Sequence, residues 1–141
     1  MDIVIHHNPA CSTSRNVLKL IRDAGYDPVV VEYLKTGWTR GQLQALFAAA
    51  GLTAREGMRS VRSPAQELGL LEEGVSNDAI LDAMVAHPAL VHRPIVVCKN
   101  GVKICKPVGD VLDLLDTWPV GPWAKENGDL ILDDTGARVG A

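Results

Sequence analysis

The N-terminal quarter of the chain constrains the fold most strongly. The apolar run Ile3–Ile5 predicts a short buried strand that ends at His6. Apolar residues at helical spacing follow Cys11 and stop at Gly25, a residue that favours a left-handed helix end. The β-branched run Val29–Leu34 predicts a second strand. A strand, a helix and a strand in this order predict two parallel strands joined by a right-handed crossover.

Three helices are predicted in the middle of the chain. Capping boxes begin at Thr39 and Ser63, and Ser76 is a third candidate cap before an apolar stripe. The last of these helices is expected to stop near His87 and Pro88, because the residue before a proline avoids the helical conformation.

A hairpin and a final helix are predicted after this helical stretch. Pro94–Cys98 and Val102–Cys105 read as strands, and the Asn100-Gly101 pair between them is typical of a type I′ hairpin turn. Pro107 is expected to open a helix. We expect residues 125–141 to form a weak hairpin or a loosely packed extension.

The order of these elements predicts an α/β fold of the thioredoxin type. A parallel βαβ unit and an antiparallel hairpin would form one mixed sheet, with a helical insertion at about 38–88 between its second and third strands. The 141 residues are enough for one domain with a real core, so we expect a single domain over 1–141 with a C-terminal tail at about 122–141.

Composition excludes several classes of protein. The net charge of -3 provides no basic surface for nucleic acid. No apolar run approaches the roughly 20 residues of a membrane span, and no signal peptide is evident. Three cysteines without a CxxC pair favour a reducing, cytoplasmic setting, and four histidines lack the spacing of a metal site. We expect a monomer.

Cys11 is the candidate nucleophile because it lies where a strand ends and a helix begins. The first N–H groups of a helix lack internal partners, and the helix dipole is positive there, so a thiolate and a bound oxyanion are both favoured. Hydroxyls at Ser12–Ser14 and the charge of Arg15 follow directly, and His6 and His7 precede it. Most free cysteines are small buried hydrophobes. The polar turn around this one favours a reactive thiol instead.

Arg93 is a candidate partner for Cys11. In a thioredoxin-type sheet the residue before the hairpin strand lies close to the cysteine turn, and here that residue is Arg93, followed by Pro94. Proline is tolerated at the start of a strand. Taken alone, Arg93 is better explained as a surface charge at a strand end.

Four segments together resemble one known family. HHNPACSTSRN, HRPIVV, the NG hairpin and KICKP are similar to the glutaredoxin-coupled arsenate reductases, over nearly the whole chain. The resemblance implies a thioredoxin-like fold with a helical insertion. It also implies reduction of arsenate to arsenite, with no bound cofactor, glutathione as co-substrate and glutaredoxin as protein partner.

The resemblance implies roles for individual residues. Cys11 would form the covalent adduct with arsenic, His7 would lower the pKa of that thiol, and Ser14 would hydrogen-bond near the thiolate. Arg59 and Arg93 match two of the family's three anion-binding arginines, and Pro94 matches a cis proline. The third arginine is replaced by Lys106, which keeps the charge but loses the bidentate fork. Ser12 and Arg15 are further candidate anion contacts.

The source of electrons follows from the cysteine spacing. No second cysteine stands within a CxxC of Cys11, so the resolving thiol is expected to come from glutathione, followed by exchange with glutaredoxin. Cys98 and Cys105 are then dispensable, and packing in the hairpin accounts for them.

Two other functions remain open from the residues alone. A monothiol glutaredoxin-like thiol transferase shares the Cys11-x-x-Ser14 spacing, and non-enzymatic regulators that bind RNA polymerase share the fold. The phosphatase-like arsenate reductases require Cys-x5-Arg. Val17 occupies that position here, so this class is excluded.

Overall fold

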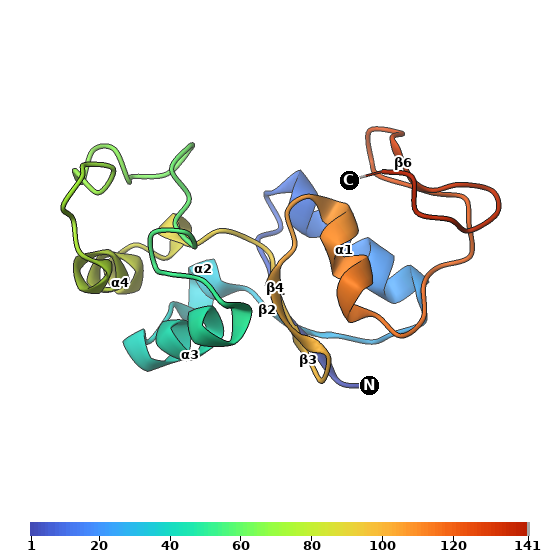
Figure 1. Cartoon of the computed structure of the whole chain (residues 1–141), viewed down its shortest axis with the longest axis horizontal. Coiled ribbons are helices and arrows are strands. Elements are labelled where there is room, and N and C mark those ends of the chain that lie inside the picture. Colours follow the sequence, from blue (N-terminus) through green and yellow to red (C-terminus); the bar gives the residue numbers. More distant parts are fainter. Residues whose placement is uncertain (141) are drawn as a thin grey trace. The chain divides into compact units, whose positions relative to one another are not determined.

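The computed structural model describes residues 1–140 and resolves into two compact units (Figure 1). The first unit consists of Met1–Glu32 together with the chain from Arg93 onward. The second unit is Tyr33–His92 and contains the predicted insertion. Within the described residues, none of the helices is both long and apolar enough to cross a membrane.

The first unit is built on a four-stranded mixed sheet. Its strands are β1 (Ile3–His6), β2 (Val29–Val31), β3 (Ile95–Cys98) and β4 (Gly101–Ile104), in the order β2-β1-β3-β4. β1 runs parallel to β2 and antiparallel to β3, and β3 pairs antiparallel with β4. The predicted parallel pair, hairpin and thioredoxin-like sheet are therefore confirmed.

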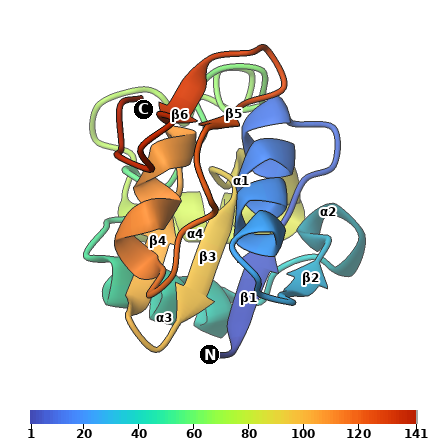
Figure 2. The same ribbon diagram turned by 90° about the vertical axis from the view of Figure 1, so that its right-hand side faces the viewer.

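Two helical segments, α1 (Ser12–Asp23) and η2 (Val108–Leu114), pack beside one another on this sheet (Figure 2). The buried stripe of α1 meets the inward side chains of β1 in one apolar core, whose members include Ile3, Ile5, Val17, Leu20, Ile21, Val111 and Leu112. η2 is a 3₁₀ helix, where the sequence predicts an ordinary helix after Pro107. Because α1 packs against both the sheet and η2, its position is fixed, and so is that of Cys11 at its start.

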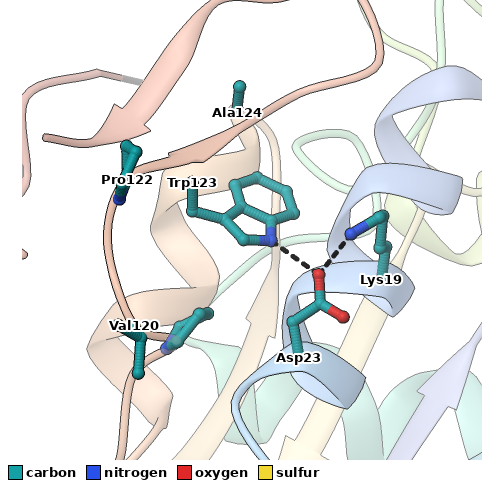
Figure 3. Close-up of a pocket in the computed structure, with 7 residues that line it drawn as sticks. Lys19, Asp23, Val120, Pro122, Trp123 and Ala124 are labelled. Carbon is teal, nitrogen blue, oxygen red and sulfur yellow. Dashed lines mark hydrogen bonds and ion pairs between the residues drawn. The ribbon is translucent and has the colours of Figure 1, made fainter. Parts of the chain in front are cut away.

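Of the two alternatives expected for the C-terminal segment, the hairpin is confirmed and the loosely packed extension is wrong, because this segment is part of the first unit's core. β5 (Trp123–Ala124) and β6 (Leu130–Leu132) form the expected hairpin. Ile131 and Leu132 are fully buried, and the Trp123 indole N–H donates to Asp23 Oδ2 over 2.9 Å (Figure 3). This segment is held by apolar contacts with residues that are distant in the sequence, so no local sequence pattern predicts them.

The second unit is helical. It contains α2 (Tyr33–Thr36), α3 (Arg40–Ala50), α4 (Asn77–Ala86) and the 3₁₀ turn η1 (Pro88–Leu90). Two predicted caps are confirmed, because the side chains of Thr39 and Ser76 accept hydrogen bonds from the N–H groups of Gln42 and Ala79 over 3.1 Å.

Two predicted elements differ from the structure. The second strand, expected over Val29–Leu34, is present but ends at Val31, and Tyr33 already begins α2. The helix expected from Ser63 is a series of turns. A single helical bond joins Leu68 N–H to the Pro64 carbonyl, and Gly69 then adopts a φ of 71°. So short a run does not repay the cost of helix nucleation.

The β3–β4 hairpin is confirmed, but its turn is not type I′. The two residues between Cys98 and Gly101 are Lys99 and Asn100, and Asn100 does not take the positive φ that this turn requires. The Asn100 side chain instead donates to the Leu114 carbonyl over 2.9 Å.

Candidate active site

Cys11 occupies the N-cap position of α1, with an extended backbone at φ -100° and ψ 123°. The first bond inside the helix runs from the Arg15 N–H to the Cys11 carbonyl over 3.0 Å. The N–H groups of the residues between them therefore have no partner along the helix. As a neutral thiol, Cys11 makes no capping hydrogen bond. As a thiolate, it is a charged acceptor beside unused donors.

The surroundings of Cys11 lower its pKa. Partial burial alone would raise the pKa of this thiol, because a thiolate loses hydration there. The backbone N–H of Ser14, the charge of Arg93, the N–H of Thr13 and a hydrogen bond from Arg93 outweigh that effect. The pKa of Cys11 consequently lies below its ordinary value, as expected for a nucleophilic cysteine.

The side chain of Ser14 is directed to the loop before the cysteine. Its hydroxyl oxygen accepts the Asn8 N–H over 3.0 Å and lies 2.6 Å from His7 Nδ1. Ser14 is fully buried, and both other residues are nearly so. Ser14 thus contributes to stabilising the Cys11 thiolate through its backbone N–H and not through its hydroxyl.

His7 is held as a neutral ring. Burial is the main cause of its lowered pKa, which Glu32 partly opposes and Arg22 and Arg15 reinforce. Burial likewise lowers the pKa of His6. A neutral ring adds no positive charge beside the sulfur, so the influence of His7 on Cys11 would have to pass through Ser14. The role that the resemblance gives His7 stays a prediction.

Arg93 is a buried cation with donors to spare. Its side chain is only 6% exposed, and Nε and Nη1 have no hydrogen-bond partner among the described residues. The pairing of His6 with Ile95 explains its position, since the chain before β3 runs back along the loop that follows β1. The Arg93–Pro94 bond is cis, the isomer that the resemblance implies. Buried donors of this kind are normally satisfied, which points to an anionic ligand.

Lys106 lies at the same end of the sheet. β4 ends opposite the first residue of β3, and the Cys105 N–H then donates to the Pro94 carbonyl over 2.9 Å. Lys106 follows directly and is exposed. Within residues 1–140 its ammonium group makes no hydrogen bond or ion pair, so its charge is available to a ligand.

Arg59 belongs to the second unit. Met58 pairs with Val91 in a short antiparallel bridge, and the Arg59 N–H donates to the Leu90 carbonyl over 2.6 Å. This bridge fixes the backbone of the loop that presents Arg59. Its part in binding an anion beside Cys11 stays a prediction.

Arg15 and Ser12 differ in their surroundings. Arg15 Nε and Nη2 donate to Glu126 over 2.9 and 3.0 Å, and Nη1 donates to the Pro9 carbonyl over 3.0 Å. Ser12 is exposed at the start of α1. Direct contact of either residue with an anion stays a prediction. The partner of Arg15 is separated from it by 110 intervening residues, and no local signal could have identified Glu126.

A surface pocket of about 450 Å³ lies at the other end of α1 (Figure 3). It is lined by two residues of the C-terminal half of the helix, Lys19 and Asp23, and by five residues of the C-terminal segment, namely Pro119, Val120, Pro122, Trp123 and Ala124. Asp23 there accepts hydrogen bonds from both Lys19 and Trp123, and Lys19 stands over the Trp123 ring. The polar groups of this pocket therefore satisfy one another. Its nearest helical residue, Lys19, lies two turns of α1 beyond Cys11, a separation of about 12 Å along the helix.

The arrangement around Cys11 fits nucleophilic attack on an anion. A thiolate, two helix N–H groups and a buried guanidinium with unused donors can hold an oxyanion and neutralise its charge as the sulfur approaches. Within residues 1–140, no group of histidine, cysteine and acidic side chains could hold a metal ion.

Comparisons with known proteins agree with this site. The model of the ArsC family matches residues 6–114. A Synechocystis protein named arsenate reductase ArsI2 is 61% identical over 97% of this chain and 98% of its own, and an Escherichia coli arsenate reductase is 41% identical over 98% of each. The structure of an arsenate reductase from Vibrio cholerae superposes with a TM-score of 0.77, at 40% identity, over 82% of this chain and 98% of that one. With its thiolate at a helix start, its buried arginine and relatives matching from end to end, the chain belongs to the ArsC family.

Proposed function

We propose that this chain is an arsenate reductase in which Cys11 attacks the arsenic of a bound arsenate. The observation that carries the proposal is Arg93, a buried guanidinium with two unused nitrogens beside a thiol of lowered pKa. Arsenate is a tetrahedral oxyanion, mostly doubly charged at neutral pH, and it needs such donors before a second anion can approach it. The arsenate reductases with matching sequences support this choice of substrate.

In the first step the Cys11 sulfur forms a bond to arsenic, and one arsenate oxygen leaves as water after taking up protons. Arg93 and the N–H groups of Thr13 and Ser14 offset the negative charge of both reactants. Arg59 and Lys106 would add two further cations around the oxyanion. Charge neutralisation therefore dominates the contribution of the protein to this step.

The two electrons that reduce arsenic come from two thiols. Glutathione attacks next, arsenic leaves as arsenite, and Cys11 is left in a mixed disulfide with glutathione. Glutaredoxin then removes glutathione by thiol–disulfide exchange and restores the Cys11 thiol. Cys105 is fully buried, and burial raises its pKa far above the ordinary value, so it is unsuited to act as an internal resolving thiol.

Lys106 should set the affinity for arsenate. A lysine ammonium supplies charge without the paired donors of a guanidinium. Lys106→Arg is therefore expected to lower the KM for arsenate, with little change in kcat.

A coupled assay tests the proposal. NADPH oxidation is followed with arsenate, glutathione, glutaredoxin and glutathione reductase, for wild type and Cys11→Ser. We expect turnover that depends on arsenate and is lost in the variant. Turnover with a glutathione mixed disulfide but none with arsenate would instead identify a thiol transferase. No turnover with either substrate, together with retention of RNA polymerase in a pull-down, would identify a regulator.

A further inference from the structure

Glu126, in the C-terminal hairpin, is bonded to two residues near the start of α1, Arg15 and Asn16. The Glu126 carboxylate receives two parallel hydrogen bonds from Arg15, at 2.9 and 3.0 Å, in the bidentate geometry that gives such pairs their strength. The Glu126 N–H also donates to Asn16 Oδ1 over 2.9 Å, and Asn16 is buried. Glu126 thus hydrogen-bonds the N-terminal part of α1 through both its side chain and its backbone.

Arg15 carries this attachment to the loop that presents Cys11. Its remaining terminal nitrogen, Nη1, donates to the Pro9 carbonyl over 3.0 Å. Three further bonds of the loop stay within the segment Asn8–Ser14, namely Ala10 N–H to Asn8 Oδ1, Cys11 N–H to the Asn8 carbonyl and Asn8 N–H to Ser14 Oγ. In addition, His7 Nδ1 lies 2.6 Å from Ser14 Oγ, and Arg93 hydrogen-bonds the Cys11 sulfur. Arg15 therefore links Pro9, on the exposed side of the loop, to Glu126 of the C-terminal hairpin.

We propose that Glu126 is a positioning residue for Cys11, which acts by clamping Arg15 onto the Pro9 carbonyl and so fixing the cysteine loop against the start of α1. The Cys11 thiolate depends on the N–H groups of Thr13 and Ser14. A loop that shifts relative to those N–H groups lengthens these bonds. The proposal rests on the proposed function only where turnover is measured.

A purely electrostatic role for Glu126 predicts the opposite result. Arg15 lies within Coulombic range of Cys11, and Glu126 neutralises it. If neutralisation were its whole effect, removing Glu126 would free a positive charge and make the Cys11 thiolate more stable. Arg15 and Glu126 are 41% and 45% exposed, so water and salt weaken that charge effect. We expect the loss of positioning to be the larger effect.

The first test measures the rate of Cys11 alkylation by iodoacetamide as a function of pH, and it requires no arsenate. Glu126→Ala should move the midpoint to higher pH, and Glu126→Gln should move it less, because one hydrogen bond from Arg15 can persist. Arg15→Ala/Glu126→Ala should match Arg15→Ala, since two residues that act in series are not additive. A midpoint in Glu126→Ala that is lower than or equal to that of wild type would overturn the proposal.

The matched control is Arg138→Gln. Arg138 belongs to the same C-terminal segment and also forms an exposed ion pair with another element of the first unit. Its partners lie in η2, namely Asp113, with Nη1 at 2.9 Å from Oδ1, and Asp110, with Nη2 at 3.6 Å from Oδ1. This variant should reproduce any general loosening of the segment and leave the midpoint of Cys11 alkylation unchanged. A shift equal to that of Glu126→Ala would assign the effect to general loosening and overturn a specific role for Glu126.

The second test separates kcat from KM in the coupled assay. Glu126→Ala should lower kcat roughly tenfold, which is within the range that a small misplacement of a reacting group costs. The KM for glutathione should stay the same. A lower KM for glutathione would show that Glu126 competes with a substrate carboxylate for Arg15, and would overturn the proposal. An inactive wild type would count against the proposed function, and the alkylation test would still decide the role of Glu126.

Discussion

At the scale of single residues, three cysteines of one chain differ because of what surrounds each sulfur. Cys11 is half-buried beside N–H donors and a guanidinium, and its pKa is lowered. Cys105 is fully buried among apolar side chains, with Asp110 nearby, and its pKa is raised. Cys98 is half-buried and its thiol faces the Leu114 carbonyl at 3.5 Å. Reactivity therefore belongs to the position and not to the residue type.

The Arg93 guanidinium should account for part of the reactivity of Cys11. The pH midpoint of Cys11 alkylation is expected to lie below that of an ordinary thiol, which is about 8.5. Arg93→Gln should raise this midpoint, because it removes the buried charge, whereas Arg93→Lys should raise it less. The measurement is the alkylation rate between pH 5 and 10. A wild-type midpoint at the ordinary value would contradict the activation of Cys11.

The other two cysteines should be dispensable for turnover. Cys98→Ser and Cys105→Ser are each expected to retain most of the arsenate-dependent activity, because the second thiol comes from glutathione. Cys105→Ser should cost about 2 kcal/mol of stability in urea unfolding, since it buries a hydroxyl in the core. Cys98→Ser, half-exposed, serves as the control for stability. Complete loss of turnover in either variant would refute an external resolving thiol.

At the scale of elements, the start of α1 is organised for chemistry at some cost to the helix. Serine, threonine, aspartate and asparagine are the residues that best cap a helix, and the caps of α3 and α4 follow this preference with Thr39 and Ser76. α1 begins instead at a cysteine, which as a neutral thiol makes no capping bond. The unused N–H groups are then available to a thiolate or to a bound anion.

A better cap at this position should stabilise the fold and abolish activity. Cys11→Asp is expected to raise the free energy of unfolding by about 1 kcal/mol relative to Cys11→Ala, because its carboxylate caps α1 and supplies a partner for Arg93. Urea unfolding at pH 7 measures this difference. Equal stabilities of the two variants would mean that the start of α1 gains nothing from a carboxylate.

At the scale of the whole molecule, stability should decline on both sides of a neutral plateau. Burial lowers the pKa values of His6 and His7 in the folded chain, so their contribution is present above the unfolded value of about 6.5 and is lost as pH falls. Ion pairs lower the pKa values of Asp23 and Asp113, whose contribution is lost below about pH 4. Cys105 behaves in the opposite way. Its pKa is raised, so its contribution is lost above the unfolded thiol value, about 8.5.

The urea midpoint measured from pH 4 to pH 10 tests these signs. It should be highest between about pH 6.5 and 8.5 and should fall on either side. Cys105→Ala should weaken the alkaline decline without altering the acid one. An alkaline decline that is identical in this variant would assign it to other groups.

The sequence by itself determined most elements of the first unit and identified Cys11 as the candidate nucleophile. Local patterns are sufficient for β1, α1, the hairpin and the caps at Thr39 and Ser76, because these depend on neighbours within a few residues. The position of Cys11 at a helix start is equally local. The turns after Ser63 and the short strand β2 were mispredicted where local propensity was weak and tertiary contacts prevailed.

Only the tertiary structure decided which distant residues meet. The burial of Arg93 with unused donors follows from the antiparallel register of β1 and β3, whose residues lie some 90 positions apart. The packing of Ile131 and Leu132 in the core, and the pairing of Glu126 with Arg15, bring the C-terminal segment to the first helix. A sequence shows which residues are charged and which are apolar. Which distant residues contact one another is set only when folding brings the two ends of a long intervening segment together.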